Sequence, residues 1–572
     1  MPALKNFQGT EGLNFFEQDR GFQMILESIL PGQERDAIFS SLYECGRLAG
    51  GRWNEMAAAA SRHEYLPKIL KSDRVGNPLE RIDFGEITPR LRREVAEFGV
   101  LTKSKSEVHK FATVYLLCHN GEGSLSCGLS CTDGLIRAIE ARGNAFLRET
   151  YIPKLRSVET PFAGAQFVTE RAVGSDVGAI EASASPDGSG AWSITGEKWF
   201  CSNPDEFFLV AARYDPNQAG TKGVAVFMVP RVLQDGTLNR LQFRKLKDKL
   251  GTQSLPTAEI IFDGATGYPI GEPADGFKTL MTYVINVSRV HNAASACAFV
   301  HRAFIEARNY ARQREAFGDT LVNYPMIQET LITLLETAWR NRILTFRLCA
   351  LLDEHGLEPG LEPAGPGQAM WQRFLINLAK YRTAVTVTEM VREAILIMGA
   401  NGIVEDFSVL PRLLRDSMII ETWEGPHNTL SLQIVRDAAR SDLLDRWRSE
   451  VNLALNRWPP DFMTFTRTRV SQALVEIEGL MLGERLRNHQ WAEANARRLV
   501  DRLGTLLEIA WMGELAAGMS GIDWTPALLT ASARYRLLAS DRAFDHPILE
   551  EITRNAAALI DEIPLVADVS QL

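Results

Sequence analysis

Residues 192–200 read WSITGEKWF, one of six short runs rich in β-forming residues between about 162 and 270. The other five runs cover residues 164–168, 207–212, 223–229, 238–246 and 257–262. Gly, Pro, Asn and Asp separate the runs, and the segments DGSG at 187–190 and DG at 235–236 are typical of hairpin turns. This regular spacing predicts an antiparallel barrel or sandwich in the middle of the chain.

Helical patterns flank the β-rich segment on both sides. Residues 33–45 carry apolar side chains at helical spacing, and similar patterns follow at 83–96, 108–117 and 132–141. Beyond Asp275, long helices are predicted over residues 277–314, 325–355 and 367–398. A Pro/Gly-rich linker at 358–367 separates two of them, and Trp458-Pro459-Pro460 interrupts the helical region after residue 440.

These patterns predict an α+β fold with helices on either side of a β-rich middle. We expect four domains, because 572 residues exceed what one hydrophobic core can hold. They are an N-terminal helical domain, a middle β-domain, a helical bundle and an additional helical extension, with the expected boundaries 1–162, 163–272, 273–440 and 441–572.

The composition limits the class of partner. A net charge of −9 offers no general attraction to nucleic acid or to an anionic membrane surface. The N-terminus lacks the pattern of a signal peptide, and no run reaches the roughly 18 uncharged apolar residues of a membrane span. Seven scattered cysteines, an odd number, favour a reducing compartment, so we expect a cytoplasmic protein.

Neither a metal site nor a glycine-rich nucleotide loop stands out. Cys127 and Cys131 lie near Cys118 and His119, but one cysteine pair without a second favours buried free thiols, so no metal is expected. The segment Gly121-Glu122-Gly123 lacks the third glycine and the preceding strand of a dinucleotide fingerprint. Any nucleotide cofactor must therefore be held in another way.

A single stretch carries a candidate general base. Residues 413–428 read LLRDSMIIETWEGPHN, in which a helical run ends at Glu424, because Gly425-Pro426 cannot continue it. Trp423 would shield Glu424 from water and raise its pKa, which suits proton abstraction beside a carbonyl. The alternative interpretation is an ordinary helix-end glutamate under a surface tryptophan.

Four motifs in order resemble the acyl-CoA dehydrogenase family. They are FVTERAVGSD at 167–176, ITGEKWFCSN at 194–203, RQREAFG at 312–318, and Arg415-Asp416 followed by Glu424-Gly425. Within the family, VPRVLQDG at 229–236, LKDKLG at 246–251, Asn428 and the long C-terminal extension are similar to the AidB-type branch.

The resemblance implies a reaction and a base. Members of the family remove the α-proton of an acyl-CoA thioester and transfer a β-hydride to N5 of FAD. By resemblance Glu424 is the base, and its backbone N–H with a flavin hydroxyl binds the thioester oxygen. Some subfamilies place the base elsewhere, but here Ser288 precedes Arg289 at that position, which leaves Glu424 as the candidate.

The resemblance also implies a set of binding residues. Thr169 and Ser175 would bond the flavin, Ser202 and Phe200 would replace a threonine and a tryptophan, and Arg314 would reach FAD in a neighbouring subunit. We therefore expect a homo-oligomer, a dimer of dimers. The expected cofactor-binding residues are Phe167, Thr169, Gly174, Ser175, Phe200, Ser202, Arg314, Phe317, Trp423, Gly425 and Asn428, and those for acyl-CoA are Ser175 and Arg289.

Three positions depart from the family pattern. Pro426 replaces the usual threonine, Leu396 replaces a glutamine, and Gln253 stands where many members have arginine. These changes affect the expected contacts to FAD and CoA rather than the class of reaction. The resemblance leaves two electron acceptors open, an electron-transfer flavoprotein and oxygen.

Two other functions compete with the dehydrogenase. One is an AidB-like flavoprotein with a DNA-associated stress role, and the other is a non-catalytic binder of acyl-CoA or fatty acid. Residues 446–572 contain 14 arginines, 17 acidic residues and no lysine, so the extension has no excess of positive charge for phosphates. A basic helix face could still form from Arg485, Arg487, Arg497, Arg498 and Arg502, opposed by Glu484, Glu493 and Asp501.

Overall fold

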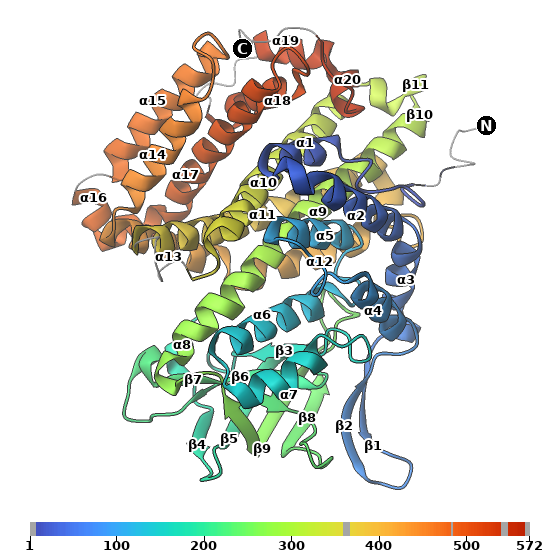
Figure 1. Ribbon diagram of the computed structural model, residues 1–572. Helices are drawn as coiled ribbons and strands as arrows, with labels where there is room; N and C mark the ends of the chain where they lie inside the picture. The colour runs from blue at the N-terminus through green and yellow to red at the C-terminus, as the bar shows by residue number, and fades with distance from the viewer. Residues whose placement is uncertain (1–6, 8, 359–365, 482–483, 539–546, 567–572) are drawn as a thin grey trace. The chain divides into compact units, whose positions relative to one another are not determined.

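The computed structural model describes residues 7, 9–358, 366–481, 484–538 and 547–566. Helices precede and follow a β-rich middle, which confirms the predicted fold class (Figure 1). The chain forms two compact units. Unit 1 comprises Met1–Gly51, Ser106–His119 and Asn292–Leu572, and unit 2 comprises Arg52–Lys105 and Asn120–His291. Among the described residues, no helix is long and apolar enough to cross a membrane.

Unit 2 is built on a seven-stranded sheet. All six predicted strands are present, and a seventh, β4, was not predicted. Their bounds are β3 (Gly164–Phe167), β4 (Ser183–Pro186), β5 (Trp192–Ser202), β6 (Phe207–Arg213), β7 (Val224–Pro230), β8 (Leu241–Leu246) and β9 (Thr257–Pro269). The order β6-β4-β5-β9-β7 closes on itself because β7 also pairs with β6, as a barrel requires. Most pairs are antiparallel as predicted, but β3 and β4 run parallel to β6.

The longest pairing of the sheet joins β5 to β9. It runs from Trp192 opposite Gly267 to Ser202 opposite Thr257, with an irregularity between Lys198 and Cys201. A bulge of this kind bends the strand and changes the direction of its side chains. The bulge therefore contains Trp199 and Phe200, the two aromatic residues of the GEKWF motif.

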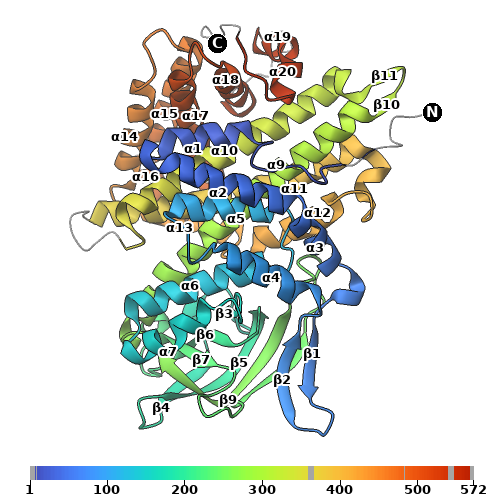
Figure 2. The same cartoon turned by 45° about the vertical axis from the view of Figure 1, so that its right-hand side comes forward.

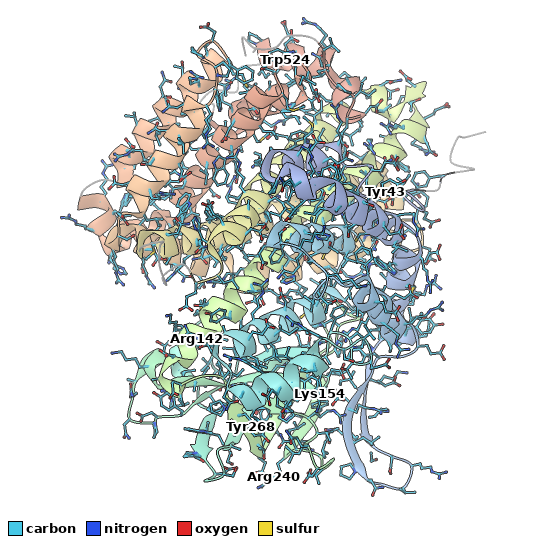
Figure 3. The ribbon with its side chains drawn as sticks, in the orientation of Figure 1. Tyr43, Arg142, Lys154, Arg240, Tyr268 and Trp524 are labelled. Atoms are coloured by element: carbon cyan, nitrogen blue, oxygen red, sulfur yellow. The ribbon has the colours of Figure 1, made fainter. Side chains whose placement is uncertain are left out.

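Helices of unit 2 cover the sheet. Helices α6 (Ser126–Arg142) and α7 (Ala145–Leu155) lie along one side of it (Figures 1 and 2). The backbone N–H of Gly164 donates to Thr132 Oγ1 at 3.0 Å, and a Cβ at Gly164 would lie 2.8 Å from Thr132 Cα, so only glycine permits this approach. Figure 3 labels Lys154 of α7 and Tyr268 of β9, which both contact the ring of Tyr151.

The N-terminal part of unit 2 contains a hairpin in a segment predicted to be mostly helical. Strands β1 (Lys68–Ser72) and β2 (Pro78–Asp83) pair antiparallel, and Asp73 accepts backbone hydrogen bonds from Val75 and Asn77 in the turn. The helix predicted from residue 83 begins later, as α4 (Ile87–Phe98). The other helices of unit 2 are α3 (Arg52–Ala60), α8 (Gly276–Thr279), a π-helical turn (Leu280–Ile285) and the start of α9 (Asn286–Gln313).

Unit 1 is helical, and its long helices match the prediction closely. Helix α10 spans Pro325–His355, and α11 spans Pro366–Met398; most of the predicted linker between them lies outside the described residues. The other helices of the bundle are α1 (Arg20–Ile29), α2 (Gly32–Gly50), α5 (Glu107–Cys118), α12 (Leu410–Thr422) and α13 (His427–Arg440).

The C-terminal extension forms helices α14 to α20. Helices α14, α15, α17 and α18 lie side by side (Figures 1 and 2). The predicted interruption at Trp458-Pro459-Pro460 separates the first two of them. The bounds are α14 (Leu443–Asn456), α15 (Thr464–Met481), α16 (Glu484–Arg487), α17 (His489–Gly518), α18 (Thr525–Leu538), α19 (Pro547–Arg554) and α20 (Ala556–Ile560).

A buried ionic cluster joins the extension to the bundle. Glu508 of α17 accepts from Arg340 of α10 at 3.0 Å and from Arg382 of α11 at 2.7 Å. All three side chains are buried. Burial alone would raise the pKa of Glu508, but Arg382 and Arg340 outweigh it and lower that pKa to about 2. Glu508 is therefore a permanent anion between two buried cations.

We expect Glu508→Gln to lower the free energy of unfolding by about 3–5 kcal/mol, because each guanidinium group loses the nearer of its two carboxylate partners. The pKa of Glu508 is depressed in the folded protein, so its contribution is complete above the unfolded value of about 4.3. It is lost as the pH falls towards 2. Urea unfolding at several pH values measures this, with the exposed Glu354→Gln as control; equal stability of the two variants would contradict it.

Candidate functional site

The predicted base lies in the short loop between α12 and α13. Helix α12 begins where Ser408 Oγ accepts from the N–H of Leu410 at 3.1 Å, and it ends at Thr422. Glu424 has a φ of +54° and Gly425 one of +104°, two consecutive left-handed residues. A side chain at positive φ costs about 1 kcal/mol or more and is found where the surroundings enforce it. The helix stop predicted from Gly425-Pro426 is confirmed.

Contacts from α11 hold this loop at its backbone. The buried Lys380 Nζ donates to the carbonyl oxygen of Glu421 at 3.0 Å and to that of Gly425 at 2.9 Å. Trp423 and Glu424, between these two carbonyls, are half-buried. Lys380 was not among the predicted site residues, although its position directly after the mostly apolar run FLINLA at 374–379 is a signal of a buried, paired cation.

A second carboxylate fixes the loop through its side chain. Glu421 accepts hydrogen bonds from Thr388 Oγ1 and from His427 Nε2, the latter at 2.9 Å. Burial raises the pKa of Glu421, but the hydrogen bonds from His427 and Thr388 outweigh it, so the pKa lies below its usual value. Glu421 is thus a stable anion that ties α11, α12 and α13 together, and it is poorly suited to act as a base.

In unit 2, the end of β3 and the loop after it carry four predicted binding residues. Phe167 is buried against Phe208, with ring centroids 4.9 Å apart. Thr169 is half-buried, and its carbonyl accepts from the N–H of Trp199 at 2.9 Å. Beyond it, Gly174 and Ser175 are exposed, and a Cβ at Gly174 would meet open space.

A buried ion pair anchors that loop to β5. Lys198 Nζ lies 2.6 Å from Glu170 Oε1 and also donates to the carbonyl of Val168 at 3.1 Å. The same carboxylate accepts from the backbone N–H groups of Glu181 at 2.7 Å and Ala182 at 3.1 Å. Burial lowers the pKa of Lys198 while Glu170 opposes that shift. The motif residues Glu170 and Lys198 therefore hold the loop in shape.

Aromatic and hydroxyl groups line the neighbouring end of β5. Phe200 is 51% exposed at the strand irregularity, and Lys247 Nζ lies 4.7 Å from its ring centroid. Ser202 Oγ lies 3.0 Å from Thr257 Oγ1 on β9, and Lys249 Nζ donates to the same Thr257 at 2.9 Å. This part of unit 2 therefore presents an exposed aromatic face near the half-buried hydroxyl group of Ser202.

The predicted substrate residue Arg289 lies on α9 within unit 2 and is buried. Its neighbour Ser288 is also buried, and its hydroxyl lies 3.2 Å from Ser130 Oγ and 3.2 Å from Gln166 Nε2. A serine cannot act as the carboxylate base that some subfamilies place at this position.

Arg314 and Phe317 lie at a small hairpin after α9 in unit 1. Strands β10 (Glu315–Ala316) and β11 (Asp319–Thr320) flank a turn in which Phe317 has a φ of +54° and Gly318 one of +95°. Positive φ at both central residues defines a type I′ turn. Phe317 is 98% exposed at its tip. Arg314 is half-buried, and its side chain has no ion pair among the described residues.

The remaining predicted positions lie at the surface. Asn428 is exposed in the first turn of α13, Gln253 is exposed and donates to the carbonyl of Lys249 at 3.2 Å, and Leu396 is 63% exposed. Within the described ranges no group of three or more His, Cys, Asp and Glu could hold a metal ion. Cys127 and Cys131 are free, with their sulfur atoms 3.8 Å apart.

Comparison with known proteins identifies the family. The acyl-CoA dehydrogenase middle domain matches residues 165–265, and the acyl-CoA dehydrogenase C-terminal domain matches residues 274–439. Together the two domains include the sheet of unit 2 and the loop of Glu424. The chain belongs to the acyl-CoA dehydrogenase family.

Individual relatives extend the match. Acyl-CoA dehydrogenase family member 11 of Caenorhabditis elegans is 28% identical over 445 residues, which cover 74% of this chain and 70% of that protein. AidB of Escherichia coli is 32% identical over 270 residues, 47% of each chain, in line with the predicted AidB-type resemblance.

Solved structures share the fold over nearly the whole chain. The apo form of Bd2924 has a TM-score of 0.79 at 28% identity and covers 89% of this chain and 99% of its own. The Caenorhabditis elegans ACDH-11 complex with C11-CoA has a TM-score of 0.84 at 24% identity and covers 97% of both chains. The matches to these two structures therefore include part of this chain's C-terminal extension as well as its family domains.

We expect Lys198→Met to destabilise the protein by about 3–5 kcal/mol, because Glu170 would remain buried without its cation. Amide exchange at Glu181 and Ala182 should accelerate as well, since both N–H groups bind Glu170. Thermal unfolding and hydrogen exchange measure these effects against the exposed Lys222→Met. A change below about 0.5 kcal/mol would show that the ion pair does not hold the loop.

Proposed function

We propose that this protein is an FAD-dependent acyl-CoA dehydrogenase in which Glu424 removes the α-proton of an acyl-CoA thioester. The observation that carries the proposal is the Glu424 loop. A half-buried carboxylate stands there at positive φ, and buried side chains hold the backbone on both sides of it. Proteins maintain such strain where geometry matters for function. Family membership supplies the reaction class.

The residues of the chain fit FAD, which combines an aromatic ring system with an anionic pyrophosphate. Phe200 presents an open aromatic face, and Ser202 and Ser175 offer hydroxyl groups. Arg314 is a guanidinium without an ion-pair partner among the described residues, which suits a pyrophosphate. We assign the cofactor to these residues together with Phe167, Thr169, Gly174, Phe317, Trp423, Gly425 and Asn428.

The chemistry divides between cofactor and chain. When bound, FAD accepts the β-hydrogen of the substrate as hydride. Glu424 accepts the α-proton, and the loop backbone donates to the thioester oxygen, where negative charge develops. Arg289 and Ser175 are assigned to the CoA part of the substrate. Glu421 stays ionised through its bonds to His427 and Thr388 and leaves the proton transfer to Glu424.

The hairpin of unit 1 supports the proposal of a homo-oligomer, a dimer of dimers. Phe317 exposes 98% of its surface at the tip of a tight turn, which makes its ring accessible to a second copy of the chain. We propose that Phe317 and Arg314 reach the FAD of a second copy of the chain. An electron-transfer flavoprotein is the proposed electron acceptor.

The described part of the C-terminal extension does not favour the alternative of DNA binding. Among its candidate arginines, Arg502 donates to the carbonyl of Leu537 at 3.2 Å, and Arg498 donates to Asn495. These bonds turn two of the five guanidinium groups toward the protein. The DNA-associated alternative and the non-catalytic binder are therefore kept as outcomes of the experiment.

Purified protein should be yellow, and one or more members of a panel of acyl-CoAs should bleach that colour without oxygen. Glu424→Gln should bind the same acyl-CoA and slow the bleaching by about 10²- to 10⁴-fold, the usual contribution of a general base. Glu393→Gln, at a surface ion pair with Arg392, is the control and should bleach at the wild-type rate.

Other results would reject the proposal. A colourless protein that binds acyl-CoA supports the non-catalytic binder. A yellow protein that no acyl-CoA bleaches, and that binds duplex DNA with a steep dependence on salt, supports the DNA-associated alternative.

We expect Arg314→Gln to raise the dissociation constant for FAD roughly 10- to 100-fold, because one hydrogen bond between charged groups is lost. Titration of the apoprotein by flavin fluorescence measures this. The control is Arg312→Gln at the end of the same helix, where the guanidinium already pairs with Asp561. Equal dissociation constants for the two variants would contradict the role assigned to Arg314.

A further inference from the structure

We propose that Lys380 is the positioning residue of the catalytic loop and sets the direction in which Glu424 points. The proposal rests on the function proposed for Glu424. Lys380 lies in the middle of α11 and is completely buried, with two of its three N–H donors on the carbonyls of Glu421 and Gly425. None of the four family motifs in the sequence includes Lys380.

The first of the two bonds is a helix cap. The carbonyl of Glu421 belongs to the last turn of α12, where carbonyl groups have no partner within the helix. The preceding carbonyl, that of Ile420, accepts from Asn292 Nδ2 at 3.1 Å. A cation at the C-terminal end of a helix is also favoured by the helix dipole. These facts explain why a buried ammonium is tolerated here.

The second bond distinguishes positioning from capping. Gly425 follows the predicted base, so its carbonyl is not part of the helix end. Bonds at 3.0 Å and 2.9 Å from one nitrogen to residues 421 and 425 enclose Thr422, Trp423 and Glu424 in a closed loop. A rotation about the backbone of Glu424 would move the Gly425 carbonyl away from the ammonium. The lysine thereby restrains the φ of +54° at Glu424.

The side chain of Glu421 supports the same geometry from the other end. It binds Thr388 and His427, and Thr388 lies two helical turns after Lys380 on the same face of α11. One face of α11 therefore binds Glu421 twice, at its backbone through Lys380 and at its side chain through Thr388. Of these two α11 residues, Lys380 is the one that also binds the backbone after Glu424, at the carbonyl of Gly425.

The test compares Lys380→Met, which has no donor, with Lys380→Gln, which keeps two neutral N–H donors. A displacement of about 1 Å costs on the order of 100-fold in rate. We expect flavin bleaching in Lys380→Met to slow about 100-fold at saturating acyl-CoA, with unchanged FAD content, using the acyl-CoA that bleaches the wild type fastest. Lys380→Gln should recover part of the rate, which general destabilisation would not explain.

A second measurement does not depend on activity. Hydrogen exchange of a peptide covering residues 421–428 should accelerate at least about tenfold in Lys380→Met, because the loop opens locally when both bonds are lost. The control is Arg340→Met, which removes another buried cation of unit 1 and its bond to Glu508. It should lower stability without accelerating exchange in this peptide. If Lys380→Met does not fold, Lys380→Gln alone should show both effects at smaller size.

The outcomes separate the two proposals. Wild-type bleaching and wild-type exchange in a folded Lys380 variant would overturn the positioning role. So would equal effects in Arg340→Met. If exchange accelerates as expected but no acyl-CoA bleaches even the wild type, the proposed dehydrogenase fails while the hold of Lys380 on the loop is supported.

Discussion

An ionised side chain can be buried only where other groups replace the water that it loses, and in this protein that constraint shapes each functional segment. The Lys198–Glu170 pair fixes the loop after β3, because the carboxylate binds two backbone N–H groups as well as the ammonium. Lys380 fixes the loop after α12 by binding the carbonyls of Glu421 and Gly425. In both places a buried charge sets the backbone, and the residues proposed to meet ligands are left half-buried or exposed.

The loop of Glu424 shows how local and long-range effects combine. Gly425-Pro426 stops α12 for reasons that lie within a few residues, but this alone would leave the direction of Glu424 open. Contacts from Lys380, Thr388 and His427 then select one conformation, and it includes a left-handed glutamate. The strain at Glu424 is therefore maintained by groups on two other helices.

Much of the fold could be predicted from the sequence because its signals are local. Alternation and turn residues located six strands of the sheet, and helical spacing located α10 with its bounds of 325–355. The β1–β2 hairpin and β4 were missed because their segments are short and largely polar, so partners distant in the sequence decide their structure. The parallel pairing of β3 with β6 is a tertiary property of the same kind.

The candidate site divides in the same way. Glu424, Arg314 and the motif residues of β5 could be proposed because they lie in short motifs that resemble those of the family. Lys380 and Thr388 could not, since they lie more than thirty residues before the loop that they hold, and only the packing of α11 on α12 brings them to it. Trp423 and Glu424 are both half-buried. The shielding of the Glu424 carboxylate by Trp423 stays a prediction.

The ionic cluster around Glu508 makes the bundle and the extension depend on each other. Arg340 and Arg382 belong to the bundle that the family C-terminal domain covers, whereas Glu508 and Asp501 belong to the extension. Without the extension, Arg382 would lose both of these carboxylates, while Arg340 would keep Glu336 on its own helix. The extension thus supplies negative charge that the bundle surface beneath it lacks, and a bundle expressed alone would present an unbalanced guanidinium group there.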